Sequence, residues 1–249
     1  MQRPVFCANW KMNHGPTEAR AYMASFLGIF SPRNDRTIAM FPPALSVTAA
    51  REARGDRTDI LLGIQNIYTD EKGAFTGESS APMAADAGAL LTLVGHSERR
   101  HVFGETDEAV AKKCAIAARF GLAPVLCVGE TLAERKSGDT DTVVVRQLRA
   151  GLSLLTASQL RTSIIAYEPV WAIGTGHSAT PADASHVHRR IRDLLCELAP
   201  TAAGEIPILY GGSVNRQNVD ALLEAPEIDG VLVGGACLDP ESWAAICRT

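Results

Sequence analysis

The sequence has no long apolar run, no closely paired cysteines and no excess of basic residues, and each absence excludes a class of protein. No apolar stretch approaches the ~20 residues that a membrane-spanning helix needs, and no cleavable leader precedes the first apolar run. The six cysteines include no C-x-x-C pair, and a chain of this length needs no disulfides to bury a core. We therefore expect a cytoplasmic protein, not bound to a membrane, whose cysteines are reduced packing residues; a reactive thiol is the alternative.

The balance of charge argues against general nucleic-acid binding. The chain holds 24 Lys and Arg against 28 Asp and Glu, a formal net charge of −4, whereas nucleic-acid binding needs a basic surface. No spacing of His, Cys and acidic residues is typical of a metal site, so we expect no metal. Apolar residues make up 46% of the chain, and no Pro/Ser-rich stretch or charge run interrupts it, which predicts a single folded domain over residues 1–249.

Eight short apolar runs recur about every 32 residues, the length of one strand plus one helix. The runs are continuously apolar rather than alternating, which is typical of parallel strands covered on both faces. They begin near Pro4, Thr37, Asp59, Ala89, Ala123, Ser163, Pro207 and Gly230.

Eight such units in about 250 residues predict an α/β fold, a closed parallel (β/α)8 barrel. The alternative is an open, doubly wound parallel sheet. That fold usually has a glycine-rich turn after its first strand, whereas here the first strand is followed by Asn-Trp-Lys-Met-Asn at residues 9–13.

Two titratable residues stand where a barrel carries its active site, at the carboxyl ends of its strands. Glu168 ends the sixth apolar run; partial burial would raise its pKa and make it a better base. His96 follows the fourth run and precedes a short helix, whose N-terminus would keep the imidazole neutral. The alternatives are that Glu168 is a structural residue in a salt bridge and that the imidazole of His96 only forms hydrogen bonds within its own turn.

Glycine pairs follow the last two strands and indicate a phosphate site. The segments are Gly211-Gly212-Ser213 and Gly234-Gly235. They would expose main-chain N–H groups in the loops where such barrels bind phosphate. The alternative is that they are ordinary turn glycines. Lys11, just after the first strand, could neutralise substrate charge or act as a Schiff-base nucleophile, unless it is a solvated surface lysine.

The segment after Glu168 predicts a lid. Residues 169–176 are rich in glycine, yet they include Trp171 and Ile173, and apolar side chains in such a loop need something to cover. A loop that closes over Glu168 and excludes water would use them.

Four motifs resemble the triosephosphate isomerase family, in order along the whole chain: 9-NWKMN-13, 95-GHSERR-100, 167-YEPVWAIGTG-176 and 210-YGGSVN-215. The resemblance implies interconversion of dihydroxyacetone phosphate and glyceraldehyde 3-phosphate, in glycolysis and gluconeogenesis, with no cofactor or metal. Glu168 would be the base and His96 the electrophile, a pairing for which this enzyme is the standard example. The resemblance also implies that Asn9 and Lys11 contact the substrate. It implies that the phosphate is bound by Gly174, Ser213, Gly234 and Gly235.

The chain departs from the family's usual pattern in two places. His177 and Ser178 stand where the lid normally ends in Lys and a small β-branched or hydroxyl residue, and His14 stands where glycine is frequent. The resemblance implies no chemical role for these positions.

The resemblance also implies a homodimer. The segment from Gln65 to Glu78 has neither helical nor strand period, and long loops of this kind are usually functional. It would enter the partner subunit, with Phe75 as its apolar anchor and Thr76 near Lys11 and His96 of the partner subunit.

Two other functions fit the same residues. The first is a Schiff-base aldolase that uses Lys11, and the second is a barrel that binds a phosphorylated metabolite without catalysis. Covalent trapping on Lys11 would identify the aldolase, and turnover of triose phosphate would exclude the binding protein.

Overall fold

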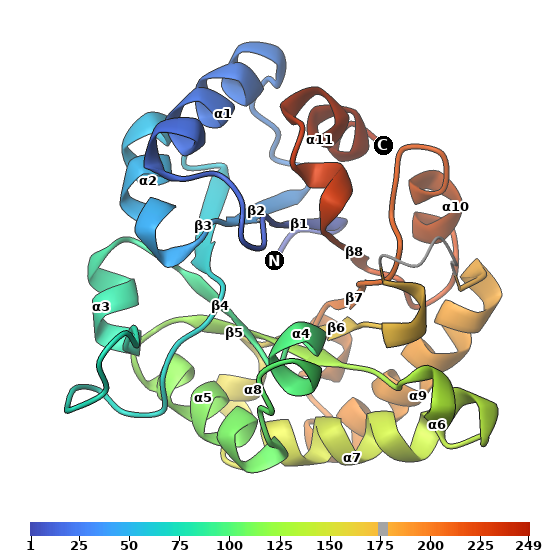
Figure 1. Ribbon diagram of the computed structural model, residues 1–249. Coiled ribbons are helices and arrows are strands. Elements are labelled where there is room, and N and C mark those ends of the chain that lie inside the picture. The colour runs from blue at the N-terminus through green and yellow to red at the C-terminus, as the bar shows by residue number, and fades with distance from the viewer. Residues whose placement is uncertain (174–178) are drawn as a thin grey trace.

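Eight parallel strands close into a barrel in the order of the chain, with β1 hydrogen-bonded to both β2 and β8 (Figure 1). The computed structural model describes residues 1–173 and 179–249. The strands are β1 (Val5–Asn9), β2 (Thr37–Phe41), β3 (Ile60–Ile64), β4 (Leu91–Val94), β5 (Ala123–Val128), β6 (Ile164–Tyr167), β7 (Ile208–Tyr210) and β8 (Gly230–Val233).

The strands are apolar on both faces because each face is covered. Alternate residues such as Val5, Cys7 and Phe41 fill the interior of the barrel. Their neighbours in the strands, such as Phe6 and Ile38, pack outward in one cluster with helix residues. Continuous apolar runs are therefore what this architecture requires.

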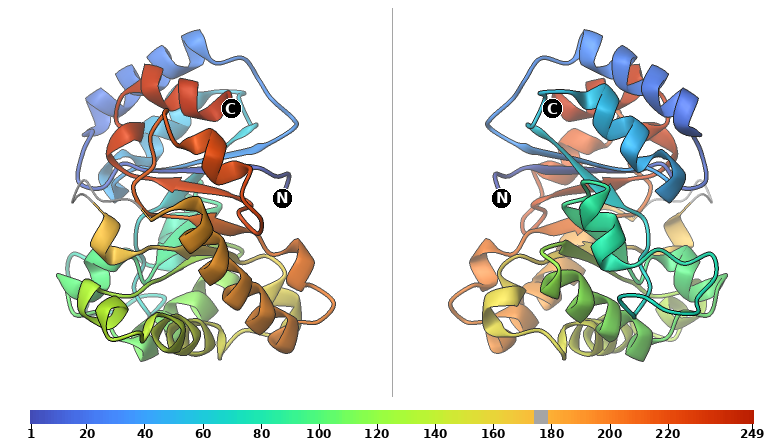
Figure 2. Two further views of the ribbon diagram at one scale, coloured as in Figure 1. Left: turned by 90° about the vertical axis from the view of Figure 1, so that its right-hand side faces the viewer. Right: turned by 90° about the vertical axis from the view of Figure 1, so that its left-hand side faces the viewer.

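Helices surround the barrel and run between consecutive strands (Figures 1 and 2). The α-helices are α1 (Pro16–Ile29), α2 (Val47–Arg54), α3 (Ala81–Asp86), α4 (Ser97–His101), α5 (Asp107–Arg119), α6 (Leu132–Lys136), α7 (Thr140–Leu152), α8 (Ala157–Leu160), α9 (Pro181–Leu198), α10 (Val219–Leu223) and α11 (Pro240–Cys247). The 3₁₀ turns are η1 (Ala44–Ser46), η2 (Val170–Ala172), η3 (Ala203–Glu205) and η4 (Gly235–Cys237). In Figure 2 the chain begins at the end of the barrel opposite η2.

The predicted barrel is confirmed, and the open sheet is wrong because β1 pairs with β8. Each predicted strand starts within two residues of the observed one, because a strand buried on both faces is visible in the sequence as a continuous apolar run. All six cysteines are free, and Cys196 alone among them is exposed. Among the helices that the structure describes, none has both the length and the apolar character to cross a bilayer.

Candidate active site

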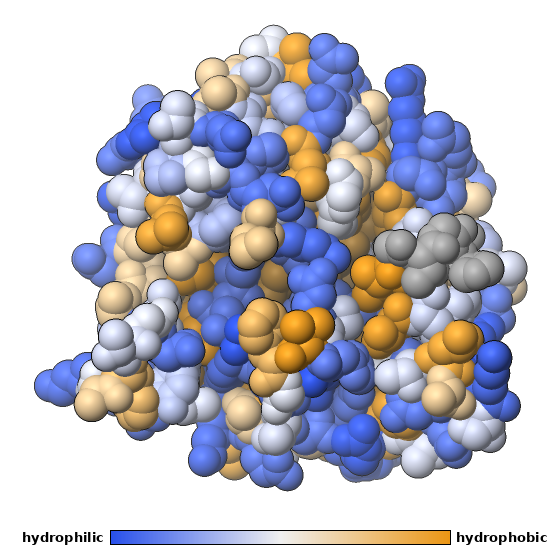
Figure 3. Space-filling view, viewed as in Figure 1, coloured by the Kyte–Doolittle hydropathy of each residue, from blue (hydrophilic) through white to orange (hydrophobic). Residues whose placement is uncertain are grey.

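A pocket of about 370 Å³ opens at the carboxyl ends of the strands. The space-filling view shows this face hollowed near its centre (Figure 3). Seven of the eight residues predicted from the sequence line the pocket: Asn9, Lys11, His96, Glu168, Ser213, Gly234 and Gly235. The eighth, Gly174, lies outside the described residues, as do His177, Ser178 and the distal part of the predicted lid.

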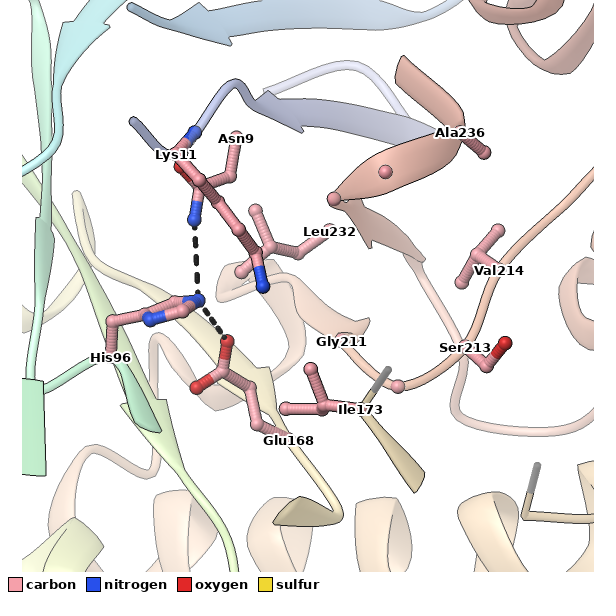
Figure 4. Close-up of a pocket in the computed structure, with 13 residues that line it drawn as sticks. Asn9, Lys11, His96, Glu168, Ile173, Gly211, Ser213, Val214, Leu232 and Ala236 are labelled. Atoms are coloured by element: carbon pink, nitrogen blue, oxygen red, sulfur yellow. Dashed lines mark hydrogen bonds and ion pairs between the residues drawn. The ribbon is translucent and has the colours of Figure 1, made fainter. Parts of the chain in front are cut away.

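Glu168 and His96 face each other across the pocket (Figure 4). Glu168 follows β6 directly and is 2% exposed, and His96 stands two residues beyond β4 and is 6% exposed. The Nε2 atom of His96 lies 3.0 Å from Oε1 of Glu168, while Oε2 accepts a hydrogen bond of 2.8 Å from the main-chain N–H of Ser97. Both oxygens of the carboxylate are therefore engaged in the free protein.

This pairing reverses the pKa shift that the sequence predicts for Glu168. Burial by itself raises the pKa of the carboxyl, as expected, but the contact with His96 and the N–H of Ser97 stabilise the carboxylate more strongly. The pKa of Glu168 consequently lies below its usual value. The expectation of a raised pKa is wrong for the free protein, because it took account of burial and not of the partner.

The pKa of His96 also differs from the expectation of a neutral imidazole. Burial lowers the pKa, but the charge of Glu168 and the hydrogen bond to it outweigh burial, so the pKa lies above its ordinary value. The helix N-terminus does act as expected on the other ring nitrogen, because Nδ1 accepts the main-chain N–H of Glu98 at 3.3 Å. That bond leaves Nε2 as the atom that donates into the pocket.

Lys11 is held in a strained backbone conformation over the pocket. Its backbone φ angle is 51°, a value that residues other than glycine seldom adopt. Three hydrogen bonds or ion pairs fix it: its N–H donates to Oδ1 of Asn9 at 3.0 Å, its carbonyl accepts from Gln65 at 2.8 Å, and its Nζ lies 2.6 Å from Oε1 of Glu98. The ammonium therefore points into the pocket as a charged donor.

Asn9 is oriented by the same loop. Because its Oδ1 accepts from Lys11, its amide nitrogen faces His96 and lies 3.2 Å from Nε2. Two N–H donors, one on Asn9 and one on His96, thus converge on one spot in the pocket (Figure 4).

The glycines of the last two loops leave room for the site. A Cβ at Gly211 would lie 2.9 Å from Cγ of Glu168, and one at Gly234 would lie 3.1 Å from Cε of Lys11. Side chains at these positions would push against the two charged groups of the pocket. The sequence placed Gly211 in a predicted phosphate loop, and its close approach to Glu168 is seen only in the structure.

The described start of the predicted lid is anchored to a buried carboxylate. Glu130 is fully buried and accepts hydrogen bonds from Tyr167 and from Nε1 of Trp171, the latter at 2.8 Å. The guanidinium of Arg135 lies 4.4 Å from the centre of the Trp171 ring. Ile173 lines the pocket, as expected. Glu130 was not predicted from the sequence, because its partners lie 37 and 41 positions away.

No three His, Cys, Asp or Glu side chains within residues 1–173 and 179–249 are grouped so that they could hold a metal ion. The chemistry that these residues offer is acid–base: a buried carboxylate, an imidazole N–H and an ammonium around one small cavity.

Comparison with known proteins assigns the family. Residues 4–249 match the model of the triosephosphate isomerase family. The chain is 47% identical to the triosephosphate isomerase of Solibacter usitatus, over 99% of both chains. It is also 47% identical to that of Symbiobacterium thermophilum, covering 99% of this chain and 96% of the relative, and 45% identical to that of Aquifex aeolicus, covering 98% of each. The chain belongs to the triosephosphate isomerase family.

Proposed function

We propose that this protein interconverts dihydroxyacetone phosphate and D-glyceraldehyde 3-phosphate by proton transfer, the reaction that gives its family its name and that belongs to glycolysis and gluconeogenesis. The observation that carries the proposal is the buried contact of 3.0 Å between Glu168 and His96 in a pocket that Lys11 also lines. A base, an N–H donor and a cation around one small cavity are what an enediolate intermediate requires.

Glu168 acts as the base. Its carboxylate removes a proton from the carbon beside the substrate carbonyl, and the electron pair left behind moves onto the carbonyl oxygen to give the enediolate. The carboxyl then returns the proton to the neighbouring carbon. No cofactor is consumed, because the same group takes and gives the proton.

His96 and Asn9 act on the oxygens. The N–H of His96 hydrogen-bonds the carbonyl oxygen, stabilises the charge that develops there, and moves protons between the two oxygens. The amide of Asn9 donates beside it, and the Lys11 ammonium offsets the negative charge of the enediolate.

Glu168 has to leave its resting partners before it can react. Both of its oxygens are engaged by His96 and by the N–H of Ser97, so the side chain must turn away from them toward the substrate carbon. That movement also removes the main influence that raises the pKa of His96. The helix N-terminus at Glu98 remains, and it favours a neutral imidazole in the complex.

The loops after β7 and β8 hold the phosphate. Ser213 lies across the pocket from His96 (Figure 4), and Gly234 and Gly235 also line the pocket. The main-chain N–H groups of these three residues bind the phosphate oxygens. Gly174 joins them in this proposal. The decisive experiment is to assay the purified, metal-free protein for isomerisation of triose phosphate; absence of turnover would overturn the proposal and leave the aldolase and the binding protein as the alternatives.

The geometry disfavours the Schiff-base aldolase. The Lys11 nitrogen is in an ion pair of 2.6 Å with Glu98, and an ammonium is not a nucleophile. Treatment with borohydride in the presence of substrate should therefore leave Lys11 unmodified; a trapped adduct would restore the aldolase.

We further propose that the protein is a homodimer formed through residues 65–78. This loop projects from the barrel between β3 and α3 (Figure 1), and its Phe75 packs on Tyr68 while remaining 39% exposed. Met12, next to the strained Lys11, is 95% exposed, and its apolar side chain could pack against a second copy of the chain. The loop of a second copy, with Thr76 reaching toward Lys11 and His96 of the partner subunit, would supply that contact.

The remaining proposals concern domain structure and location. Because strands from Val5 to Val233 close one barrel, we propose that residues 1–249 act as one domain. Because all six cysteines are free, we propose a cytoplasmic location.

A further inference from the structure

A buried glutamine in the outer layer contacts the main chain beside the pocket. Gln147 lies on α7 and is 4% exposed. Its Oε1 accepts the N–H of Gly129 at 2.7 Å, and its Nε2 donates to the carbonyl of Gly129 at 3.2 Å. The side-chain amide thus pairs with both main-chain polar groups of one residue, as a neighbouring strand would.

The glutamine occupies the place of a strand that has turned away. β4 pairs with β5 only as far as Val94 and Leu126, and the chain then turns into α4 to present His96 to the pocket. The end of β5 loses its partner there, and unpaired buried main-chain groups are costly. The carbonyl of Cys127 accepts from Arg100 at 3.3 Å, and Gly129 is satisfied by Gln147.

The opposite edge of the same segment carries Glu168. The N–H of Glu168 donates to the main-chain carbonyl of Val128 at 2.8 Å, and the N–H of Val170 donates to the main-chain carbonyl of Glu130 at 3.1 Å. Gly129 lies between them, so close that a Cβ there would stand 1.8 Å from the carbonyl oxygen of Glu168. The two main chains are in contact, and a displacement of Gly129 would displace Glu168.

We propose that Gln147 is a positioning residue for Glu168, which it places by fixing the main chain of Gly129. The proposal rests on the role of base proposed above for Glu168. It implies that a residue outside the pocket controls turnover, because a small misplacement of a reacting group lowers the rate steeply.

The chemistry of the side chain supplies the test. Methionine fills the volume of Gln147 but forms neither hydrogen bond. An ionised glutamate accepts the N–H of Gly129 but repels its carbonyl, whereas the protonated acid can accept from one and donate to the other. Q147E should therefore recover the wild-type arrangement as its carboxyl takes up a proton.

The experiment compares Q147M, Q147E and, as a control, V144A, a truncation of a fully buried residue one turn earlier on α7. Each variant is assayed for kcat and KM across pH, with thermal unfolding measured in parallel. We expect Q147M to lose about tenfold in kcat, with KM within twofold of wild type. V144A should lose stability with little change in kcat. The kcat of Q147E should exceed that of Q147M, and relative to wild type it should rise toward acid pH.

The role of Gln147 is overturned if Q147M keeps wild-type kcat, if V144A loses turnover as Q147M does, or if Q147E and Q147M agree at every pH. If Q147M does not fold, the test rests on Q147E alone. In that case the proposal is overturned if the kcat of Q147E, relative to wild type, does not rise toward acid pH. A wild-type protein that does not isomerise triose phosphate would instead overturn the function proposed above for Glu168.

Discussion

Single residues in the pocket are held by partners that are distant in the sequence. Glu168 meets His96 from 72 positions away, and Lys11 meets Glu98 from 87. Each contact joins loops from different strands, so the electrostatics of the site depend on barrel closure.

Replacing Glu168 tests the base. Glu168→Gln keeps the shape but cannot take a proton, and a positioned base contributes ~10²–10⁴-fold, so kcat should fall by about that factor while phosphate-bearing analogues still bind. Glu168→Asp should also be slow, by about 10²-fold, because its carboxylate is withdrawn by about 1 Å. Steady-state assays and analogue titration measure both. A near-normal rate in either variant would remove Glu168 from the mechanism.

Replacing His96 tests the electrophile. His96→Gln can still donate a hydrogen bond but cannot shuttle a proton, so we expect kcat to fall by about 10²-fold or more, with a much smaller change in the affinity for a phosphate analogue. The split between kcat and KM is the measurement. If KM rises and kcat does not change, His96 only binds substrate.

At the scale of elements, the strand ends that carry the site depend on loops and helices around them. Residues 65–78 supply Gln65, which donates to the carbonyls of both Lys11 and Phe41 at 2.8 Å. The proposed dimer loop and the strained Lys11 loop are thus connected within one subunit.

Placing a charge on the dimer loop tests the assembly. Phe75→Asp should prevent burial of the loop tip in a second subunit, because an unpaired charge is costly to bury. We expect the protein to sediment as a monomer and to lose at least about tenfold in activity, since the Lys11 loop would lose its cover. Leu154→Asp, a change at an exposed residue away from this loop, is the control. A Phe75→Asp protein that keeps the mass and activity of the wild type would disprove this interface.

At the scale of the whole molecule, a buried histidine on α9 links stability to pH. His188 is 0% exposed, its Nδ1 bonds the carbonyl of Glu227 at 2.9 Å, and its Nε2 has no hydrogen-bond partner among the described residues. Burial lowers the pKa of His188 to about 4. The folded protein therefore keeps this imidazole neutral at pH values where the unfolded chain protonates it.

The consequence is a loss of stability toward acid. Between about pH 6.5 and 4 the unfolded chain binds one more proton at this site, so the free energy of unfolding should fall by ~1.4 kcal/mol per pH unit, or about 3 kcal/mol in all. Below pH 4 this contribution is constant. Denaturant unfolding of wild type and His188→Gln across this range measures it, and we expect a flatter slope for the variant. Equal slopes would mean that His188 is not held neutral in the fold.

The sequence by itself determined the barrel, the positions of its strands and the polar residues that line the pocket. Strands buried on both faces are visible as continuous apolar runs, and barrel topology brings every residue after a strand to one end. Only the tertiary structure decided how those residues influence one another. The pKa of Glu168 is lowered and that of His96 raised because the two lie 3.0 Å apart, and Gln147 pairs with Gly129 because β4 turns away there. Such effects depend on distances across the fold, and the spacing of residues along the chain carries no record of them.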